Sequence, residues 1–434
     1  MNAVGFIFTL INCILIWTLP RRWAMLPLLI GAAYMTRGQM LDIGPAHFPV
    51  IRIIVTVGLL RVMSRHERIV GGINRLDRIL IIWAMGMVIT SIFHTSAGLV
   101  FRVGVVWTEL GCYFLFRIFL QDLKDIERMF KVVCVLLIPV MLTMMLEKLN
   151  GQNLYATLGL GGVRDVAAFR GGKFRAQGPF AHAILAGTVG AVCFGMALYL
   201  WFKQRKFALL GIASTGGIAY AAGSSGPIMT AAAIFGAMLV WRIRDKLRLI
   251  RWGILLALVA LNFVMKDPVY YLLARIDITG SSTGWHRAHL IHAAVTHLNE
   301  WWLIGTDYTR HWMPTGVHAN EIHTDITNHY LQMGVWGGLP VMLLFIWILV
   351  VGFSEIGRAL RANRQAPFAQ QFLIWTLGCM LFGHLTNIFS ISYFDQSIVF
   401  FYLLLAMIAT LRVVKFVKSV PAPITIDPAA ASPA

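Results

Sequence analysis

Residues 176–202 read AQGPFAHAILAGTVGAVCFGMALYLWF, a stretch without Asp, Glu, Lys or Arg. It is longer than the roughly 20 apolar residues that a helix needs to cross a bilayer. Similar stretches occupy 79–101, 207–241 and 365–394. Of all 434 residues, 58% are hydrophobic and 13% are charged, and the mean hydropathy is +0.72. This composition excludes a soluble protein. The sequence predicts an all-α, polytopic integral membrane protein with a single transmembrane domain.

The charges along the chain indicate its orientation in the bilayer. We expect thirteen spans, at approximately 1–19, 23–36, 46–63, 79–95, 100–117, 131–147, 180–202, 207–221, 227–242, 250–266, 329–353, 368–386 and 394–414. Alternate loops then hold 25 of the 37 Lys and Arg residues, and these loops are cytoplasmic by the positive-inside rule. The N-terminus is expected outside and the C-terminus inside. The net charge of +18 therefore reflects orientation and does not indicate a nucleic-acid partner.

The cysteines and the C-terminal tail carry no predicted site. All five cysteines fall in apolar spans, so neither a disulfide nor a cysteine metal centre is expected. Residues 421–434 are rich in Pro and Ala and are expected to form a disordered cytoplasmic tail.

Two longer outward segments interrupt the series of spans. Residues 148–179 combine several glycines with Arg164, Arg170 and Arg175. Arginine binds phosphate oxygens in a bidentate manner and stays charged, so this segment is a candidate anion site. A solvated loop is the alternative. Five of the twelve outward Lys and Arg residues lie in this one segment, which favours the anion site.

The second outward segment, 267–328, is rich in His and Trp and is expected to form a helical lid on the outer leaflet. A helix is predicted over 284–298, and residues 301–304 are expected at the membrane interface. His286, His289 and His292 are spread around that helix, which is poor geometry for one metal. We therefore predict no metal site, and expect a neutral histidine to act as a general base.

Two charged residues inside apolar spans need partners or water. Arg52 lies in the third span and Glu109 in the fifth. Each costs about 2.5 to 3.5 kcal/mol at a helix centre. They either pair with each other or lie separately beside wet cavities.

Several short motifs occur in a characteristic order. Residues 281–287 read SSTGWHR, 300–307 read EWWLIGTD and 323–339 read HTDITNHYLQMGVWGGL, while RAQGPFAH at 175–182 precedes an earlier span. This order resembles the conserved domain of the O-antigen ligase and O-antigen polymerase superfamily over about 175–353.

The resemblance implies a glycosyltransferase of the bacterial inner membrane whose active site faces the periplasm. Its donor would be an undecaprenyl-pyrophosphate-linked oligosaccharide and its acceptor a glycan or lipid-linked glycan. Arg175 and Arg287 match the family's pyrophosphate-binding arginines, with Arg164, Arg170 and Asn328 as further substrate-binding candidates. Prearranged cations stabilise the charge that develops on the departing pyrophosphate, so neither a metal nor a cofactor is expected.

The general base is less clearly marked than the arginines. The family motif has His directly before Asn, whereas Thr327 precedes Asn328 here and His329 follows it. His329 is slightly favoured because it abuts Asn328 at the mouth of a span. His323 is the candidate if the motif starts one turn earlier, and Asp325 could orient either ring. A capping or interfacial role for the histidine is the remaining alternative.

Three functions follow from these observations. A polymerase of O-antigen or exopolysaccharide repeats is slightly preferred, and a ligase that transfers O-antigen to lipid A core is the alternative. A transporter for lipid-linked glycans is the alternative from another functional class, that of transport proteins. It is expected to show two related halves with broken helices, and no such symmetry is visible in the sequence.

Overall fold

The computed structural model describes residues 1–275, 284–314 and 319–412 of the chain. The predictions for residues 281–283 and for the tail at 421–434 lie outside these ranges. The protein is mostly helical, at 71% helix. Six stretches of helix are long and apolar enough to cross a membrane: Ser96–Phe119, Leu123–Asn150, Ala183–Leu200, Ser225–Val264, His329–Ala362 and Phe368–Ile388. Such a set is compatible with a multi-pass membrane protein.

Each of the thirteen expected spans contains a helix. They are α1 (Ala3–Thr18), α2 (Leu26–Tyr34), α3 (Val50–Ser64), α4 (Arg75–Ser91), α5 (Ser96–Phe119), α6 (Leu123–Asn150), α8 (Ala183–Leu200), α9 (Arg205–Ala221), α10 (Ser225–Leu239), α11 (Leu247–Val264), α15 (His329–Ala362), α16 (Phe368–Ile388) and α17 (Ile398–Thr410). Several are shorter than predicted. The third starts at Val50, because 46–49 pair as a strand.

Polar residues at the helix ends explain where these helices begin and stop. Asn74 and Asp77 form a reciprocal capping box at the start of α4. The carboxylate of Asp122 caps α6 by accepting the N–H of Asp125. The same helix ends at Gly151, whose φ of 78° favours glycine. Such caps satisfy backbone groups that the apolar spans cannot satisfy themselves.

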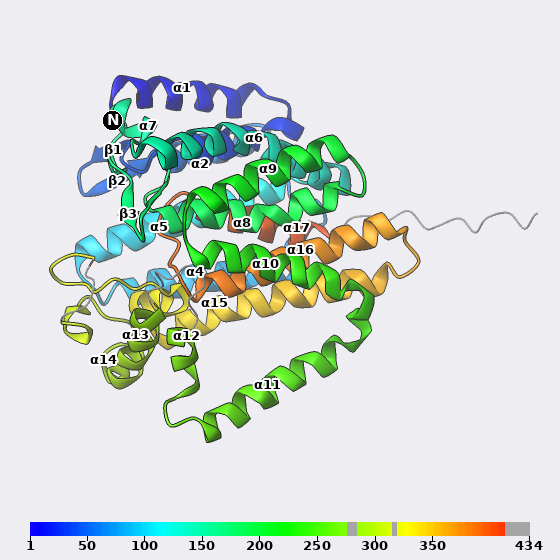
Figure 1. Ribbon diagram of the computed structural model, residues 1–434. Helices are drawn as coiled ribbons and strands as arrows, with labels where there is room; N and C mark the ends of the chain where they lie inside the picture. Colours follow the sequence, from blue (N-terminus) through cyan, green and yellow to red (C-terminus); the bar gives the residue numbers. More distant parts are fainter. Residues whose placement is uncertain (276–283, 315–318, 413–434) are drawn as a thin grey trace, which may run out of the picture.

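The centre of the bundle is formed by α8 and α17. In α8, 83% of the residues are buried, and the helix packs against α6, α9, α10 and α16. Every residue of α17 is buried. Because α17 is apolar on all sides, it is stable only when other helices surround it. Figure 1 shows it inside the bundle, behind α8 and α16.

The helix α11 has the opposite environment. None of its residues is buried, and it stands apart from the neighbouring helices (Figure 1). The 3₁₀ helix η2 (Val240–Lys246) joins it to α10, with non-helical backbone angles at Ile243. Most of its apolar side chains are therefore exposed within the described part of the chain.

One end of the bundle carries the irregular structure. Two antiparallel hairpins lie there, β1 (Met40–Ile43) with β2 (Ala46–Pro49), and β3 (Ala168–Arg170) with β4 (Lys173–Arg175). The N-terminus and the described part of the second outward segment share this end (Figure 1). We call it the hairpin end. These short strands differ from the predicted all-α fold. Each hairpin lies between two helices along the chain.

The lid, which we define as residues 284–314 and 319–328, has a small core of its own. It contains α13 (Gly284–Thr296), α14 (Leu298–Trp301) and the 3₁₀ helix η4 (Arg310–Trp312). This core includes Leu290, Trp301 and Trp312. The indole of Trp301 is 3% exposed and donates to the carbonyl of Ala294 at 2.9 Å. Trp301 therefore packs inside the protein, whereas Trp302 is half exposed; the interfacial position of residues 301–304 stays a prediction.

Candidate functional site

Arg175 is fixed by the backbone that follows it. It ends β4, and its Nε donates to the carbonyl of Ala222 at 3.4 Å. The carboxylate of Glu147, in α6, accepts the backbone N–H groups of Gln177 and Gly178 at 3.0 and 2.8 Å. Gly178 has a φ of 56°, so the turn favours glycine. Residues 175–178 are therefore anchored to the bundle, and Arg175, the first of them, is half-buried.

Arg287 approaches the same place from the lid. It lies on α13, is half-buried, and donates from Nε to the carbonyl of Ser390 at 3.2 Å. Burial lowers the pKa of Arg287, and the positive charges of Arg175 and Arg170 lower it further. The pKa of Arg175 is lowered by burial and then by the charges of Arg170 and Arg164. The charges of Arg170 and Arg175 thus act on Arg287, and those of Arg164 and Arg170 act on Arg175. We call these four residues, which come from two separate segments, the arginine cluster.

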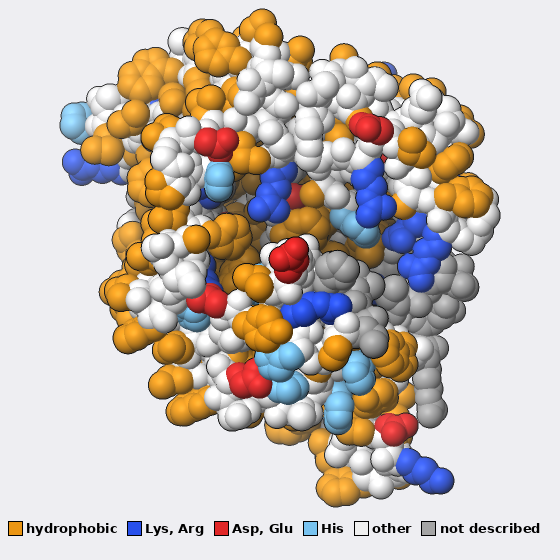
Figure 2. Space-filling view, turned by 90° about the vertical axis from the view of Figure 1, so that its left-hand side faces the viewer, with side chains coloured by type: hydrophobic (Ala, Val, Ile, Leu, Met, Phe, Trp, Pro, Cys, Tyr) orange, Lys and Arg blue, Asp and Glu red, His pale blue; other side chains and the backbone are white. Residues whose placement is uncertain are grey.

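A cluster of this kind favours an anion. Guanidinium groups stay charged in proteins, so they repel one another at this site. Burial reduces the screening of that repulsion by water. Phosphate oxygens would offset it and would accept the N–H groups that the arginines present. In Figure 2, which views the hairpin end, Lys, Arg and His side chains gather around a hollow.

The first turn of α10 lies between the two anchored arginines. A Cβ added at Gly223 would come within 3.3 Å of Cγ of Arg175, and one added at Gly226 would lie 3.3 Å from Oγ of Ser390. Ser390 is the residue whose carbonyl holds Arg287. The N-terminus of a helix carries partial positive charge and free N–H groups, and thus adds to the anion site.

His182 is a member of this site that sequence reasoning missed. It is the N-cap of α8, and its Nδ1 accepts the N–H of Ile184 at 3.1 Å. Burial, followed by the charges of Arg175 and Arg164, lowers the pKa of His182 to about 4. The ring is therefore neutral at pH 7 and carries its proton on Nε2, where it can donate to an anion. Its position directly before the apolar run was the available signal.

The slightly favoured base, His329, lies in an unfavourable place for that role. It is the first residue of α15, is 1% exposed, and packs against the rings of Phe345 and Tyr393. Its Nδ1 accepts the backbone N–H of Tyr393 at 3.3 Å. A base must reach the hydroxyl that it deprotonates. The surroundings of His329 are those of a packed core residue.

Asn328 and Asp325 also have partners other than those expected. Asn328 is 4% exposed, and its side chain caps α15 by accepting the N–H of Leu331 at 3.2 Å. Its oxygen is thus engaged with the helix. Within the described residues, the Asp325 carboxylate forms no ion pair with His323 or His329. Burial raises the pKa of Asp325, and the charge of His286 opposes this effect. The histidine that Asp325 faces is therefore His286.

His323 is the more accessible of the two base candidates. It is half-buried, and burial lowers its pKa. The charge of Asp307 opposes that shift, while Arg102 adds to it, so His323 lies near both. Its low pKa keeps the ring neutral, as a general base requires.

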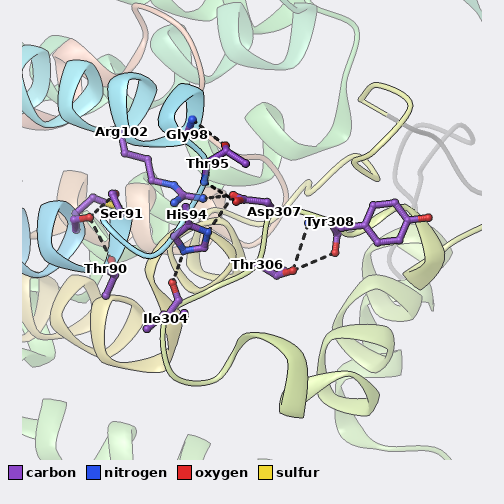
Figure 3. Close-up of polar contacts among 11 residues, drawn as sticks. Thr90, Ser91, His94, Thr95, Gly98, Arg102, Ile304, Thr306, Asp307 and Tyr308 are labelled. Atoms are coloured by element: carbon purple, nitrogen blue, oxygen red, sulfur yellow. Dashed lines mark hydrogen bonds and ion pairs between the residues drawn. The ribbon is translucent and has the colours of Figure 1, made fainter.

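Asp307 attaches the lid to the bundle (Figure 3), and its charge acts on His323. Its carboxylate lies 3.0 Å from Nδ1 of His94 and 2.9 Å from Nη2 of Arg102, and it accepts the N–H of Thr95 at 3.1 Å. Nε2 of His94 lies 2.8 Å from the carbonyl of Ile304. This one acidic residue therefore ties the lid to the start of α5.

The suggested pairing of Arg52 with Glu109 is wrong. Nε of Arg52 donates to Thr108 at 3.0 Å, and Glu109 accepts the hydroxyl of Tyr402 at 2.6 Å. Both residues border a cavity of about 130 Å³, which Arg37 and Asp395 also line. The alternative, two separate residues beside a cavity, describes the arrangement.

The three histidines of α13 point to different partners. Nε2 of His286 lies 3.2 Å from the carbonyl of Asp325, His289 stacks on Trp285, and Nδ1 of His292 lies 3.0 Å from the Tyr270 hydroxyl. They do not converge on one metal.

No protein-family model matches this chain, and no curated protein matches it. The likeness to the O-antigen ligase and polymerase superfamily rests on the short motifs alone.

Proposed function

We propose that this protein is a membrane glycosyltransferase that moves an oligosaccharide from undecaprenyl pyrophosphate to a glycan acceptor on the periplasmic face of the inner membrane. The observation that supports it most is the convergence of Arg175 and Arg287. They come from two outward segments that are distant in sequence, and they share one electrostatic environment with Arg170. A pyrophosphate leaving group needs such a set of fixed cations.

In this proposal the arginines hold the diphosphate and take up the charge that develops as the glycosidic bond breaks. The neutral ring of His182 donates a further hydrogen bond through Nε2. The acceptor hydroxyl loses its proton to His323 and attacks the anomeric carbon. Direct attack inverts the configuration at that carbon. His323 replaces His329 in this role because His329 is enclosed by aromatic side chains.

A polymerase of O-antigen or exopolysaccharide repeats remains the preferred form of this function, with a ligase onto lipid A core as the alternative. The two differ only in the acceptor. A transporter for lipid-linked glycans would also use outward arginines. Because the arginine cluster and the lid lie together at the hairpin end, chemistry on one face accounts for the arrangement better than passage across the membrane.

The test is a transfer assay with purified protein in detergent and a preformed lipid-linked oligosaccharide. A product in this mixture requires no transport. We expect Arg175→Ala and Arg287→Ala each to lower kcat/KM by about 100-fold or more, as loss of a transition-state contact does.

Arg205→Ala is the matched control. Arg205 is exposed at the start of α9, on a loop assigned to the cytoplasm. It should retain wild-type turnover. Wild-type activity in both Arg175→Ala and Arg287→Ala would refute the site. Failure of the wild-type protein to form product from lipid-linked donor and either acceptor would refute the glycosyltransferase assignment.

A further inference from the structure

A second cluster of polar side chains lies in the lid, separate from the arginines. His297 precedes α14, Glu300 lies within it, and His311 belongs to η4. Nδ1 of His297 lies 2.7 Å from the carboxylate of Glu300, and Nε2 of His311 lies 2.8 Å from it. The three donor atoms lie within 4.8 Å of one another. Residues 11 and 14 positions apart thus converge on one point.

The donor types at that point suit a transition metal. Two imidazoles and one carboxylate form a recurrent zinc ligand set, which leaves a fourth position for water or another group. The carboxylate oxygens of Glu300 and the two imidazole nitrogens surround one point, at contacts of 2.7 and 2.8 Å.

The surrounding aromatic rings hold the ligands in place. The ring of His297 stacks on Trp312, and the ring of His311 stacks on Tyr308. Nε1 of Trp312 donates to Glu300 at 3.1 Å. Such outer contacts fix the orientation of metal ligands. Stacking restricts each imidazole without using its ring nitrogens, so the nitrogens that now contact Glu300 can turn from the carboxylate to a metal.

The distances between the ligand atoms are close to those found around a bound zinc ion. Zinc bonds of about 2.0 to 2.1 Å place neighbouring ligand atoms roughly 3.4 Å apart in a tetrahedron. The present contacts of 2.7 and 2.8 Å would therefore open by roughly half an ångström to admit the ion. A side-chain rotation suffices, because all three residues are partly exposed.

We propose that His297, Glu300 and His311 bind one Zn²⁺ ion, which serves as a structural pin of the lid. The ion would join the start of α14 to η4. The chain between them carries Asp307, which is attached to the bundle through Arg102. The ion would thus hold both ends of the segment between α14 and η4, through which Asp307 attaches the lid to α5. It takes no part in glycosyl transfer, and it stands independently of that function.

Zinc binding to the full-length protein tests this proposal directly. The protein is purified in detergent through a tag without histidine, stripped with a chelator, and titrated with ZnCl₂ against a chromogenic chelator. We expect one tightly bound zinc per chain and a Tm that rises on zinc addition. His297→Ala and His311→Ala should each weaken binding by about 100-fold or more, beyond the about 10- to 100-fold that outer contacts contribute.

His289→Ala is the control, because His289 lies in the same lid and stacks on Trp285 outside the cluster. It should bind zinc as the wild type does. Glu300→Gln preserves the shape of the site. It takes the place of the alanine variants in this comparison if they fail to fold. Co²⁺ bound to the wild type should show the intense visible absorption of a tetrahedral site. No zinc uptake at micromolar metal, or equal affinity in the wild type and both alanine variants, would overturn the proposal.

Discussion

The carboxylate of Glu147 accepts a hydrogen bond of 2.8 Å from the backbone N–H of Gly178. This contact joins α6 to the turn that follows Arg175. It explains why an arginine on a short hairpin can hold a fixed position. A charge that stabilises a leaving group must be placed before the reaction, since reorganising it would cost part of the benefit.

Glu147→Ala should therefore lower both stability and activity. It leaves the buried N–H groups of Gln177 and Gly178 without an acceptor, at about 1 to 3 kcal/mol each. We expect a lower Tm and a transfer rate reduced about 10-fold or more, as Arg175 loses its anchor. Glu127→Ala is the control. Glu127 pairs with Lys203, beyond the end of α8 opposite His182, so its loss should leave the specific activity of folded protein unchanged.

Asp307→Ala should loosen the lid. Arg102, which is 4% exposed, would lose its carboxylate partner, and so would His94. We expect a loss of about 1 to 3 kcal/mol, less than for a fully buried pair because Asp307 is one-third exposed. Limited proteolysis should then cleave the lid faster. Asp42→Ala, which removes an exposed partner of His47, should stay within about 0.5 kcal/mol of the wild type. Equal cleavage of both variants would contradict this account.

His182 should make the protein less stable in acid. Its pKa is about 4 in the folded chain and about 6.5 when unfolded. Between these values the unfolded state binds more protons, so stability is full above about pH 6.5 and falls as pH drops toward about 4, by at most about 1.4 kcal/mol per unit. His182→Asn keeps a capping side chain but cannot titrate. Its Tm should fall less across this window, and an unchanged slope would refute the assignment.

Protonation of His323 should determine the pH below which the transfer rate declines. A general base works unprotonated, and burial lowers the pKa of His323 below its usual value of about 6.5. The rate should therefore hold down to about pH 6 and decline at lower pH. His323→Gln should lose at least about 100-fold in kcat and the acid limb with it. If His329→Gln loses the acid limb and His323→Gln keeps it, the base is His329.

The sequence predicted the positions of the helices because an apolar run of sufficient length has one way to satisfy its backbone in lipid. Their exact limits were less predictable, since capping by residues such as Asn74 or Asp122 depends on local contacts. The hairpin at 40–49 was missed for a related reason. Its strand at 46–49 continues directly into α3, so the whole stretch reads as one apolar segment.

Candidate site residues could be chosen from the sequence by type, but their partners could not. Arg52 and Glu109 looked like a pair because both are charged within spans, yet Thr108 and Tyr402 bind them. Asp325 was placed with His323 or His329 by proximity in sequence, whereas the fold turns it toward His286. His297 and Glu300 lie only three residues apart, but the sequence did not single them out as a pair. His311 was not recognisable as its third member.

By itself the sequence determined a mostly helical chain with helices apolar enough to cross a membrane, and two longer segments between them, one rich in arginine and one rich in histidine. Hydrophobicity and charge act along the chain and can be read there. Only the tertiary structure brought Arg175 near enough for its charge to lower the pKa of Arg287, enclosed His329 but not His323, and placed His311 beside Glu300. Each of these depends on contacts between residues distant in sequence, which arise when the helices pack and the lid folds onto their end.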